Sequence, residues 1–267
     1  MSTPDPKSRR FLELHRPGQP LLLPNPWDQG AAKVLANLGF QALATTSSGF
    51  AATLGRPDGS VTLDEALGHA TAIVAATDLP VSADLENCFA DDVDGVAHTV
   101  RLAAETGLAG CSIEDYSGSR LYDRAEAVDR VAAAVAAARD GGLVLTARAE
   151  NYLHGNPDLG DTIARLQAYQ EAGADVLYAP GLTRIEDIRT VVSSVDRPVN
   201  VLAMSGVPSA AELAEAGVSR ISVGGAFAFA VLGALVDAAT ELRDKGTYGF
   251  QNAAGVGRAA TRAAFTA

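Results

Sequence analysis

Three stretches of this sequence share one form, a short apolar run that ends in charged side chains. Residues 80–87 read PVSADLEN, residues 109–115 read AGCSIED, and residues 142–151 read GLVLTARAEN. Apolar runs of this length are typical of parallel strands that are covered on both faces. Because the charged residues follow the runs directly, these stretches predict a parallel sheet whose carboxyl edge carries the chemistry.

Five further apolar runs bring the number of expected strands to eight. The runs are 21–23, 42–45, 81–83, 110–113, 143–147, 176–179, 199–203 and 221–223. Amphipathic helical patterns lie between them, and four of these patterns open with the spacing of a capping box. The four pairs are Thr62 with Glu65, Asp123 with Glu126, Thr183 with Glu186, and Ser209 with Glu212.

Glycine and proline mark the eight runs in an alternating order. Odd-numbered runs follow Pro20, Pro80, Gly142 and Pro198, whereas even-numbered runs follow glycines that can end a helix, namely Gly39, Gly107, Gly173 and Gly217. This regularity predicts an α/β protein with a single (β/α)₈ TIM barrel over residues 1–267, in which residues 246–267 form a C-terminal tail. Tyr248, Phe250 and Phe265 of this tail are expected to dock on this subunit or on a neighbour. An open doubly wound sheet, which also alternates strands and helices, is the alternative.

The amino-acid composition limits the kinds of molecule that the protein is expected to bind. The net charge of −11 and the pI of about 4.8 argue against a nucleic-acid partner, which would need clustered Lys and Arg. Two cysteines are too few for a disulfide scaffold, and no apolar run approaches the ~18 residues of a membrane span. The first ten residues are polar rather than a signal peptide, so a cytoplasmic protein with no membrane partner is expected.

Three carboxylates fall at two neighbouring strand ends. Asp84, Glu86 and Glu114 would repel one another there, and a hard divalent cation such as Mg²⁺ or Mn²⁺ would relieve that repulsion. The alternative is that Asp84 and Glu114 cap helices or pair with Arg148.

Other polar side chains at the same edge suit a carboxylic acid. The guanidinium of Arg148 can hold a carboxylate through two hydrogen bonds. The segment Ser47-Ser48-Gly49 offers hydroxyls and backbone N–H groups, although the same tripeptide also occurs in ordinary loops. His154 follows the Arg148 segment and could reach the site.

Five motifs in this order resemble those of the isocitrate lyase/phosphoenolpyruvate mutase superfamily. They are residues 47–49, 55–59, 84–87, 112–115 and 147–150, and the resemblance extends from about Phe11 to Tyr248. It implies a barrel with a swapped eighth helix, a homodimer or homotetramer, and bound Mg²⁺. It also implies chemistry on a C–C or P–C bond beside a 2-oxo acid.

The resemblance also implies a role for each matching residue. Asp84, Glu86 and Glu114 match metal-site acids, with Asp84 as the direct ligand. Ser47, Ser48, Gly49, Arg148, Glu150 and Asn200 match substrate contacts, and Asp58, Arg148 and Glu114 are the expected catalytic residues. Glu150 resembles the Arg-x-Glu form seen on the phosphonomutase side of the superfamily.

The loop after the fourth strand departs from the superfamily. Residues 115–123 read DYSGSRLYD, where the lyases that cleave isocitrate and methylisocitrate carry Lys-Lys-Cys-Gly-His. We therefore expect a Mg²⁺-dependent lyase that cleaves a C–C bond of a small 2-oxo or 2-hydroxy acid through an enolate. Its activity would resemble that of an oxaloacetate decarboxylase or a methylisocitrate lyase. The alternatives are P–C chemistry on phosphoenolpyruvate or phosphonopyruvate, and a non-catalytic 2-oxo acid binding protein.

Asp58 is the first candidate for proton transfer, ahead of Tyr116 and Tyr122. It lies near the tip of residues 49–60, a long segment whose glycines would allow it to act as a lid. The alternative is that Asp58-Gly59 is only a turn, because Pro-Asp-Gly is a strong turn signal.

Overall fold

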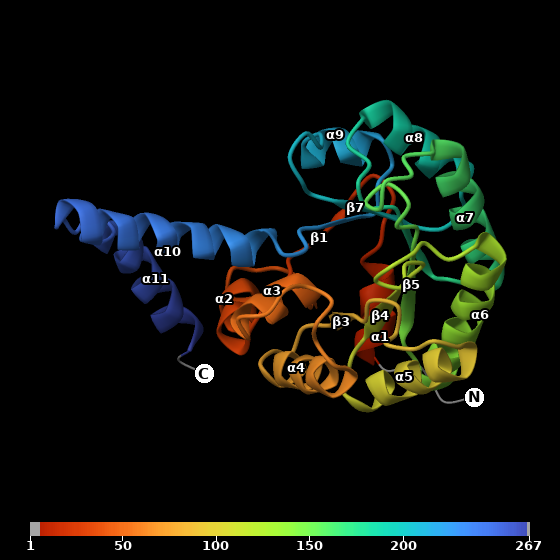
Figure 1. The fold of residues 1–267 in the computed structure, drawn as a ribbon, viewed down its shortest axis with the longest axis horizontal. Helices are drawn as coiled ribbons and strands as arrows, with labels where there is room; N and C mark the ends of the chain where they lie inside the picture. The colour runs from red at the N-terminus through yellow and green to blue at the C-terminus, as the bar shows by residue number, and fades with distance from the viewer. Residues whose placement is uncertain (1–5, 266–267) are drawn as a thin grey trace.

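Eight parallel strands form the centre of the molecule in the computed structural model, which describes residues 6–265 (Figure 1). The strands are β1(Leu21–Leu23), β2(Leu43–Ala44), β3(Val81–Asp84), β4(Gly110–Glu114), β5(Val144–Arg148), β6(Val176–Tyr178), β7(Val199–Leu202) and β8(Arg220–Ser222). Each of the eight predicted runs overlaps one strand, with ends that differ by one residue at most.

The sheet closes almost completely into a barrel. Its strand order is β1-β8-β7-β6-β5-β4-β3-β2, so β1 and β2 are the two edges. These edges approach each other, because Ala44 N donates to Pro24 O at 3.1 Å and Asn25 Nδ2 donates to Thr45 O at 2.9 Å. The predicted (β/α)₈ barrel is confirmed, and the alternative of an open doubly wound sheet is wrong.

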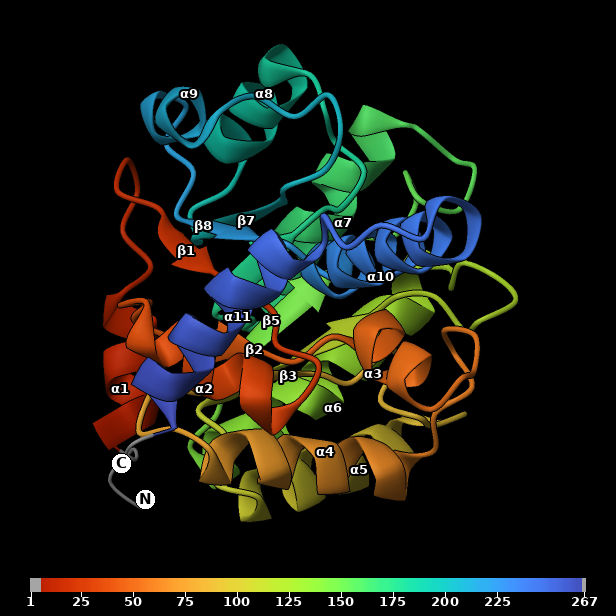
Figure 2. The ribbon, with the colours of Figure 1, turned by 90° about the vertical axis from the view of Figure 1, so that its left-hand side faces the viewer.

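Helices surround the barrel in the order that the sequence predicts (Figures 1 and 2). They are α1(Pro6–Glu13), α2(Gln29–Asn37), α3(Ser47–Thr53), α4(Leu63–Ala75), α5(Val93–Glu105), α6(Arg124–Gly141), α7(Leu159–Ala172), α8(Ile185–Ser194), α9(Ala210–Glu215), α10(Ala226–Lys245) and α11(Gln251–Ala264). Helix α1 supplies Phe11, which is fully buried against Leu21, Val144 and Val176. This apolar layer fills the amino-terminal end of the barrel and leaves the carboxyl end for the site.

Two of the four predicted capping boxes are present. Thr62 with Glu65 and Ser209 with Glu212 make the reciprocal hydrogen bonds. The prediction is wrong for Asp123, whose side chain makes no cap bond, because Glu126 instead pairs with Arg120 at 2.9 Å. It is also wrong for Thr183 with Glu186, since the cap residue of α8 is Arg184 and no side chain caps that helix.

Helix α10 leaves the barrel instead of covering it (Figure 1). Ala228 is its only buried residue, and Leu235 and Val236 are more than 60% exposed although they are apolar. An eighth helix that does not pack on its own barrel fits the expected swap between subunits, and the swap itself stays a prediction. No helix within residues 6–265 has the length and apolar character needed to span a membrane.

The described part of the tail folds into α11, which packs on α2 of the same subunit (Figure 2). Phe265 lies beneath Lys33 of α2, with 6.0 Å between Nζ and the ring centroid. Tyr248 remains 64% exposed. The expected docking of the tail therefore applies to α11 and Phe265, and Tyr248 contributes little to it.

Candidate active site

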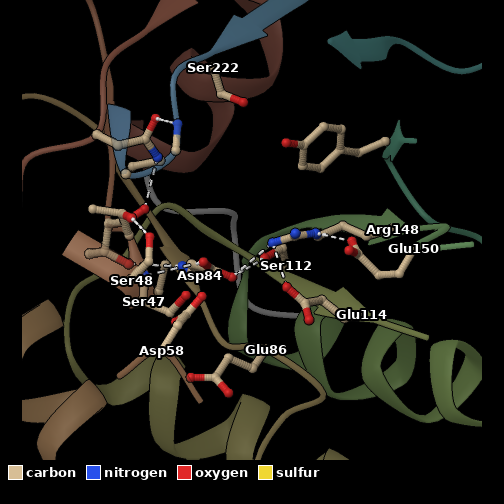
Figure 3. Close-up of a pocket in the computed structure, with 18 of the residues that line it drawn as sticks. Ser47, Ser48, Asp58, Asp84, Glu86, Ser112, Glu114, Arg148, Glu150 and Ser222 are labelled. Carbon is tan, nitrogen blue, oxygen red and sulfur yellow. Dashed lines mark hydrogen bonds and ion pairs between the residues drawn. The ribbon is translucent and has the colours of Figure 1, made fainter. Parts of the chain in front are cut away.

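A cavity of about 590 Å³ opens at the carboxyl ends of the strands (Figure 3). Nine of the ten residues to which the resemblance assigns a role line it: Ser47, Ser48, Asp58, Asp84, Glu86, Glu114, Arg148, Glu150 and Asn200. The tenth, Gly49, is buried in α3 behind the lining. Strand ends that are distant in sequence are thus brought to one place by the parallel topology.

Arg148 is the centre of the charged groups. Its Nη1 lies 3.0 Å from Asp84 Oδ1 and 2.7 Å from Glu114 Oε1, and its Nε lies 2.7 Å from Glu150 Oε1. Burial raises the pKa of Glu114 well above its ordinary value, and the Arg148 guanidinium acts in the opposite direction. Burial alone would lower the pKa of Arg148, but its carboxylate neighbours raise it well above the ordinary value. The ion pairing considered as an alternative is therefore present.

Asp84 is fixed by groups from β4 and from the residues that follow β2. Its Oδ2 accepts a hydrogen bond from Ser47 N at 3.3 Å, and its Oδ1 accepts one from Ser112 Oγ at 3.4 Å. Its backbone N–H donates to Thr45 Oγ1 at 2.9 Å. The carboxylate is consequently held at the mouth of the barrel in one orientation.

The Ser47-Ser48-Gly49 segment is the first turn of a helix and not a loop. Thr46 is the cap residue of α3, and its Oγ1 accepts from Gly49 N at 3.3 Å. A Cβ on Gly49 would lie 2.6 Å from Thr46 Cγ2, so only glycine fits there without a shift of the cap. The close packing of Gly49 lets the two serines face the cavity.

Glu86 carries a buried carboxylate oxygen without a partner. Its Oε1 makes no hydrogen bond among the described residues. Burial, followed by the negative charges of Asp84 and Asp58, raises the pKa of Glu86 to about 7. A cation between these carboxylates would satisfy the free oxygen and relieve the repulsion, so the acids at this point fit a metal.

The number of direct protein ligands would be small. Within residues 6–265, no three His, Cys, Asp or Glu side chains gather closely enough to hold an ion by themselves. Mg²⁺ commonly takes one or two carboxylates and keeps several waters, so this arrangement suits a direct bond to Asp84 with Glu86 and Glu114 acting through water.

The segment that carries Glu86 is held in a strained conformation. Glu86, Cys88 and Phe89 all have positive φ, at 49°, 63° and 52°, which side chains other than glycine rarely adopt. Arg130 from α6 restrains the segment by donating to Asn87 O at 2.9 Å and to Ala90 O at 2.7 Å. Strain of this kind is often found at functional sites, where the surrounding structure maintains it.

The two tyrosines on the loop after β4 differ in their surroundings. Tyr122 is buried, and its hydroxyl accepts from Asn87 Nδ2 at 3.0 Å while Arg130 lies over its ring. Tyr116 lines the cavity and stacks on His154, with 3.4 Å between the ring centroids. His154 also lines the cavity, so it reaches the site as the sequence allowed.

Sequence reasoning missed several polar residues in the barrel interior. Tyr178, Ser222 and Arg220 all line the cavity, and Arg220 is 4% exposed. Arg220 stands directly before the apolar run 221–223, so the sequence pattern places it outside the strand that it in fact begins. The alternation of inward-facing polar residues along a strand, as at Arg220 and Ser222, is the signal that could have found them.

Comparison with known proteins gives a family match over most of the chain. A family model described as phosphoenolpyruvate phosphomutase matches residues 11–243. The 2-methylisocitrate lyase of Escherichia coli K12 is 31% identical over 209 residues, which cover 70% of this chain and 70% of that enzyme.

Solved structures show the same likeness. A Burkholderia cenocepacia J2315 protein provisionally described as a lyase/mutase is 53% identical, with a TM-score of 0.93 over 98% of this chain and 96% of that one. Oxaloacetate acetylhydrolase, solved with its product oxalate, is 25% identical, with a TM-score of 0.82 over 93% of this chain and 90% of that one.

Proposed function

The chain belongs to the phosphoenolpyruvate phosphomutase family, and on this premise we propose that it is a Mg²⁺-dependent lyase. The substrate is a small 2-oxo or 2-hydroxy carboxylic acid whose C–C bond is cleaved to leave an enolate. The membership confirms the superfamily that the five sequence motifs resemble. The observation that carries the proposal is the convergence of Arg148 with three carboxylates in one cavity.

The metal-binding part of the proposal rests on the acids at the mouth of the barrel. Asp84 would bind Mg²⁺ directly, and Glu86 and Glu114 would contribute through water, with Mn²⁺ as a possible substitute. The unpartnered Oε1 of Glu86 supports this assignment. When bound, the ion would supply positive charge to the oxygens of a 2-oxo acid.

The residues of the chain would then bind and orient the acid. Arg148 holds the substrate carboxylate, and Glu150 fixes the guanidinium from the other side through the 2.7 Å contact. Ser47 and Ser48 face the same cavity and orient the 2-oxo oxygen. Asn200 uses its Nδ2 to donate to Ser222 Oγ at 2.9 Å, whereas its buried Oδ1 has no partner among the described residues and can accept from a substrate hydroxyl.

Asp58 is the proposed group for proton transfer. It is exposed on the segment after α3 and lines the cavity, and Gly55 and Gly59 on either side have positive φ. Residues 115–123 contain no thiol, and Tyr122 is already engaged by Asn87 and Arg130. Tyr116 is the remaining candidate on that loop.

P–C chemistry on phosphoenolpyruvate or phosphonopyruvate is the second candidate, favoured by the name of the matching family. One observation weighs against it. Arg120 is the only basic residue on the loop after β4, and it is 55% exposed and paired with Glu126 at 2.9 Å. It is therefore not directed at a phosphonate in the cavity.

A product screen tests the proposed function. Purified protein would be incubated with oxaloacetate, methylisocitrate, isocitrate, phosphonopyruvate and oxalyl compounds, with Mg²⁺ and then with chelator. Release of pyruvate or glyoxylate that stops with chelator is the expected result. Release of phosphate would favour P–C chemistry. Binding that has the same affinity with Mg²⁺ and with chelator, with no turnover, would refute both the metal and the lyase.

We also propose that the protein is a homodimer or homotetramer held together by α10. The exposed apolar residues of that helix support this assignment. Sedimentation velocity tests it with Leu235→Glu, which should reduce the assembly to a smaller species. The control is Leu38→Glu, a residue of similar exposure beside α2 that should leave the assembly unchanged.

A further inference from the structure

Arg220 is a buried charge in the barrel interior that no carboxylate neutralises. No Asp or Glu within residues 6–265 forms an ion pair with it, although its side chain lines the active-site cavity. Its Nη1 lies 3.1 Å from Thr146 Oγ1 and 3.2 Å from His15 Nε2, and its buried Nε has no hydrogen-bond partner. The guanidinium is thus held in place by polar groups that leave donor capacity unused.

The imidazole that contacts Arg220 is neutral. His15 Nδ1 lies 2.8 Å from Phe11 O, a carbonyl that can only accept, so Nδ1 carries the proton and Nε2 accepts from Arg220. Burial, followed by the charge of Arg220, lowers the pKa of His15 to about 3. Neither His15 nor Thr146 therefore offsets the positive charge.

Other neighbouring groups also leave the positive charge of Arg220 uncompensated. Burial lowers the pKa of Arg220 to about 10, and the nearby charge of Arg148 acts in the same direction. The phenol of Tyr178 acts in the opposite direction and favours the charged form. Removing a charge from water without a partner is costly, so such a group is commonly kept where a ligand completes it.

We propose that Arg220 binds a second anionic group of the substrate, a carboxylate, while Arg148 holds the first. This inference rests on the proposed lyase function and narrows its substrate class to dicarboxylic 2-oxo or 2-hydroxy acids. Arg220 and Ser222 lie on the same inward face of β8, and the unpartnered Nε provides a donor for the incoming carboxylate. An acid that has only one carboxylate would leave Arg220 unsatisfied.

A structural role for Arg220 is the competing explanation. Through His15 it joins the chain just after α1 to the barrel, and such a link could serve only to hold α1 in place. The two explanations differ in what the loss of Arg220 does. A structural arginine would lower the stability of the protein and would not distinguish one acid from another.

Three 2-hydroxy acids that differ in one group test the proposal. Lactate has no second anion, malate has a second carboxylate, and 2-hydroxy-3-phosphonopropanoate has a phosphonate in its place. Their dissociation constants would be measured by calorimetry with Mg²⁺ for the wild type, Arg220→Met, Arg220→Lys and Arg148→Met. Thermal unfolding of each variant would be recorded beside the binding.

The expected result is selective. Wild-type protein should bind malate at least ~10-fold more tightly than lactate, and Arg220→Met should remove that difference while lactate binding changes less than about twofold. Arg220→Lys should retain part of the preference for malate, and Arg148→Met should weaken the binding of both acids. Arg220→Met should unfold at the wild-type temperature or above it, because an unpaired buried charge is removed.

The opposite results separate the two proposals. If Arg220→Met weakened the binding of lactate and malate equally, or if the wild type bound the two acids equally well, the proposed role of Arg220 would be overturned. The proposed lyase function would not be affected. If the wild type bound the phosphonate most tightly and Arg220→Met lost this binding, the group that Arg220 binds would be a phosphonate and not a carboxylate. A wild type that binds none of the three acids would overturn both proposals.

Discussion

Two arginines face one cavity, and their surroundings are opposite. Arg148 at the end of β5 touches Asp84, Glu114 and Glu150, so its charge is more than balanced at the rim of the barrel. Among residues 6–265, Arg220 in β8 forms hydrogen bonds only with a hydroxyl and a neutral imidazole in the interior. The difference indicates that ion pairs within the protein organise the rim. In the interior, the charge of Arg220 has no such pair, and we propose that a ligand supplies its partner.

The comparison also separates stability from function. Breaking a buried ion pair by removing one partner leaves the other charge unpaired, and this destabilises a protein strongly. Removing a charge that has no partner carries no such penalty. The two arginines should therefore respond to the same substitution in different ways, even though both line the cavity.

The largest effect is expected for Arg148→Met. The variant should lose kcat/KM by at least ~100-fold and about 3–5 kcal/mol of unfolding free energy, because three carboxylates lose their shared cation. Initial rates and urea unfolding measure the two losses. Arg148→Lys keeps the charge but not the planar guanidinium, and its kcat/KM should still fall at least ~10-fold.

Arg220→Met is the matched control for that measurement. Its unfolding free energy should stay within about 1 kcal/mol of the wild type. The comparison between the arginines would break if Arg148→Met were as stable as the wild type while Arg220→Met unfolded.

A smaller effect, confined to the chemical step, is expected for Asp58→Asn at the rim. Asp58 is exposed, so its loss should not alter stability, but kcat should fall by about 100-fold if it transfers the proton. Steady-state rates of Asp58→Asn, Tyr116→Phe and Tyr122→Phe would be compared, and Asp64→Asn on the exposed face of α4 is the control. Full kcat in Asp58→Asn together with its loss in Tyr116→Phe would move proton transfer to the loop after β4.

The rim was largely predictable from the sequence, and the interior was not. Asp84, Glu114 and Arg148 stand at the ends of apolar runs, and a parallel barrel brings all such ends together. The contact between His15 and Arg220 joins residues 205 positions apart. Such a pairing follows from closure of the barrel over α1, and no local pattern contains it.

At the helix starts, residue spacing alone likewise could not predict every contact. Thr62 with Glu65 and Asp123 with Glu126 have the same spacing, yet only the first pair forms a capping box. Glu126 is drawn away by Arg120, and that contact depends on the fold of the loop after β4. For Ser47-Ser48-Gly49 the sequence left an ordinary loop open as the alternative, whereas the structure makes this segment the first turn of α3, capped by Thr46.

An effect that appears only at acid pH concerns the neutral state of His15, on which the interior half of the comparison depends. The pKa of His15 is about 3 in the folded protein and about 6.5 when unfolded, so below pH 6.5 only the unfolded state gains the proton. Stability should therefore fall as the pH drops from 6.5 towards 3, with His15 contributing up to ~1.4 kcal/mol per pH unit.

The variant His15→Gln should remove that contribution. Its unfolding free energy, measured by urea denaturation between pH 7 and pH 4, should decline less steeply than that of the wild type. His98→Gln, at an exposed position on α5, should keep the wild-type slope. Parallel profiles for the wild type and His15→Gln would mean that His15 gains its second proton over the same pH range in the folded as in the unfolded state, so that it is charged below about pH 6.5. It could not then accept from Arg220, and the interior would hold two positive charges instead of one.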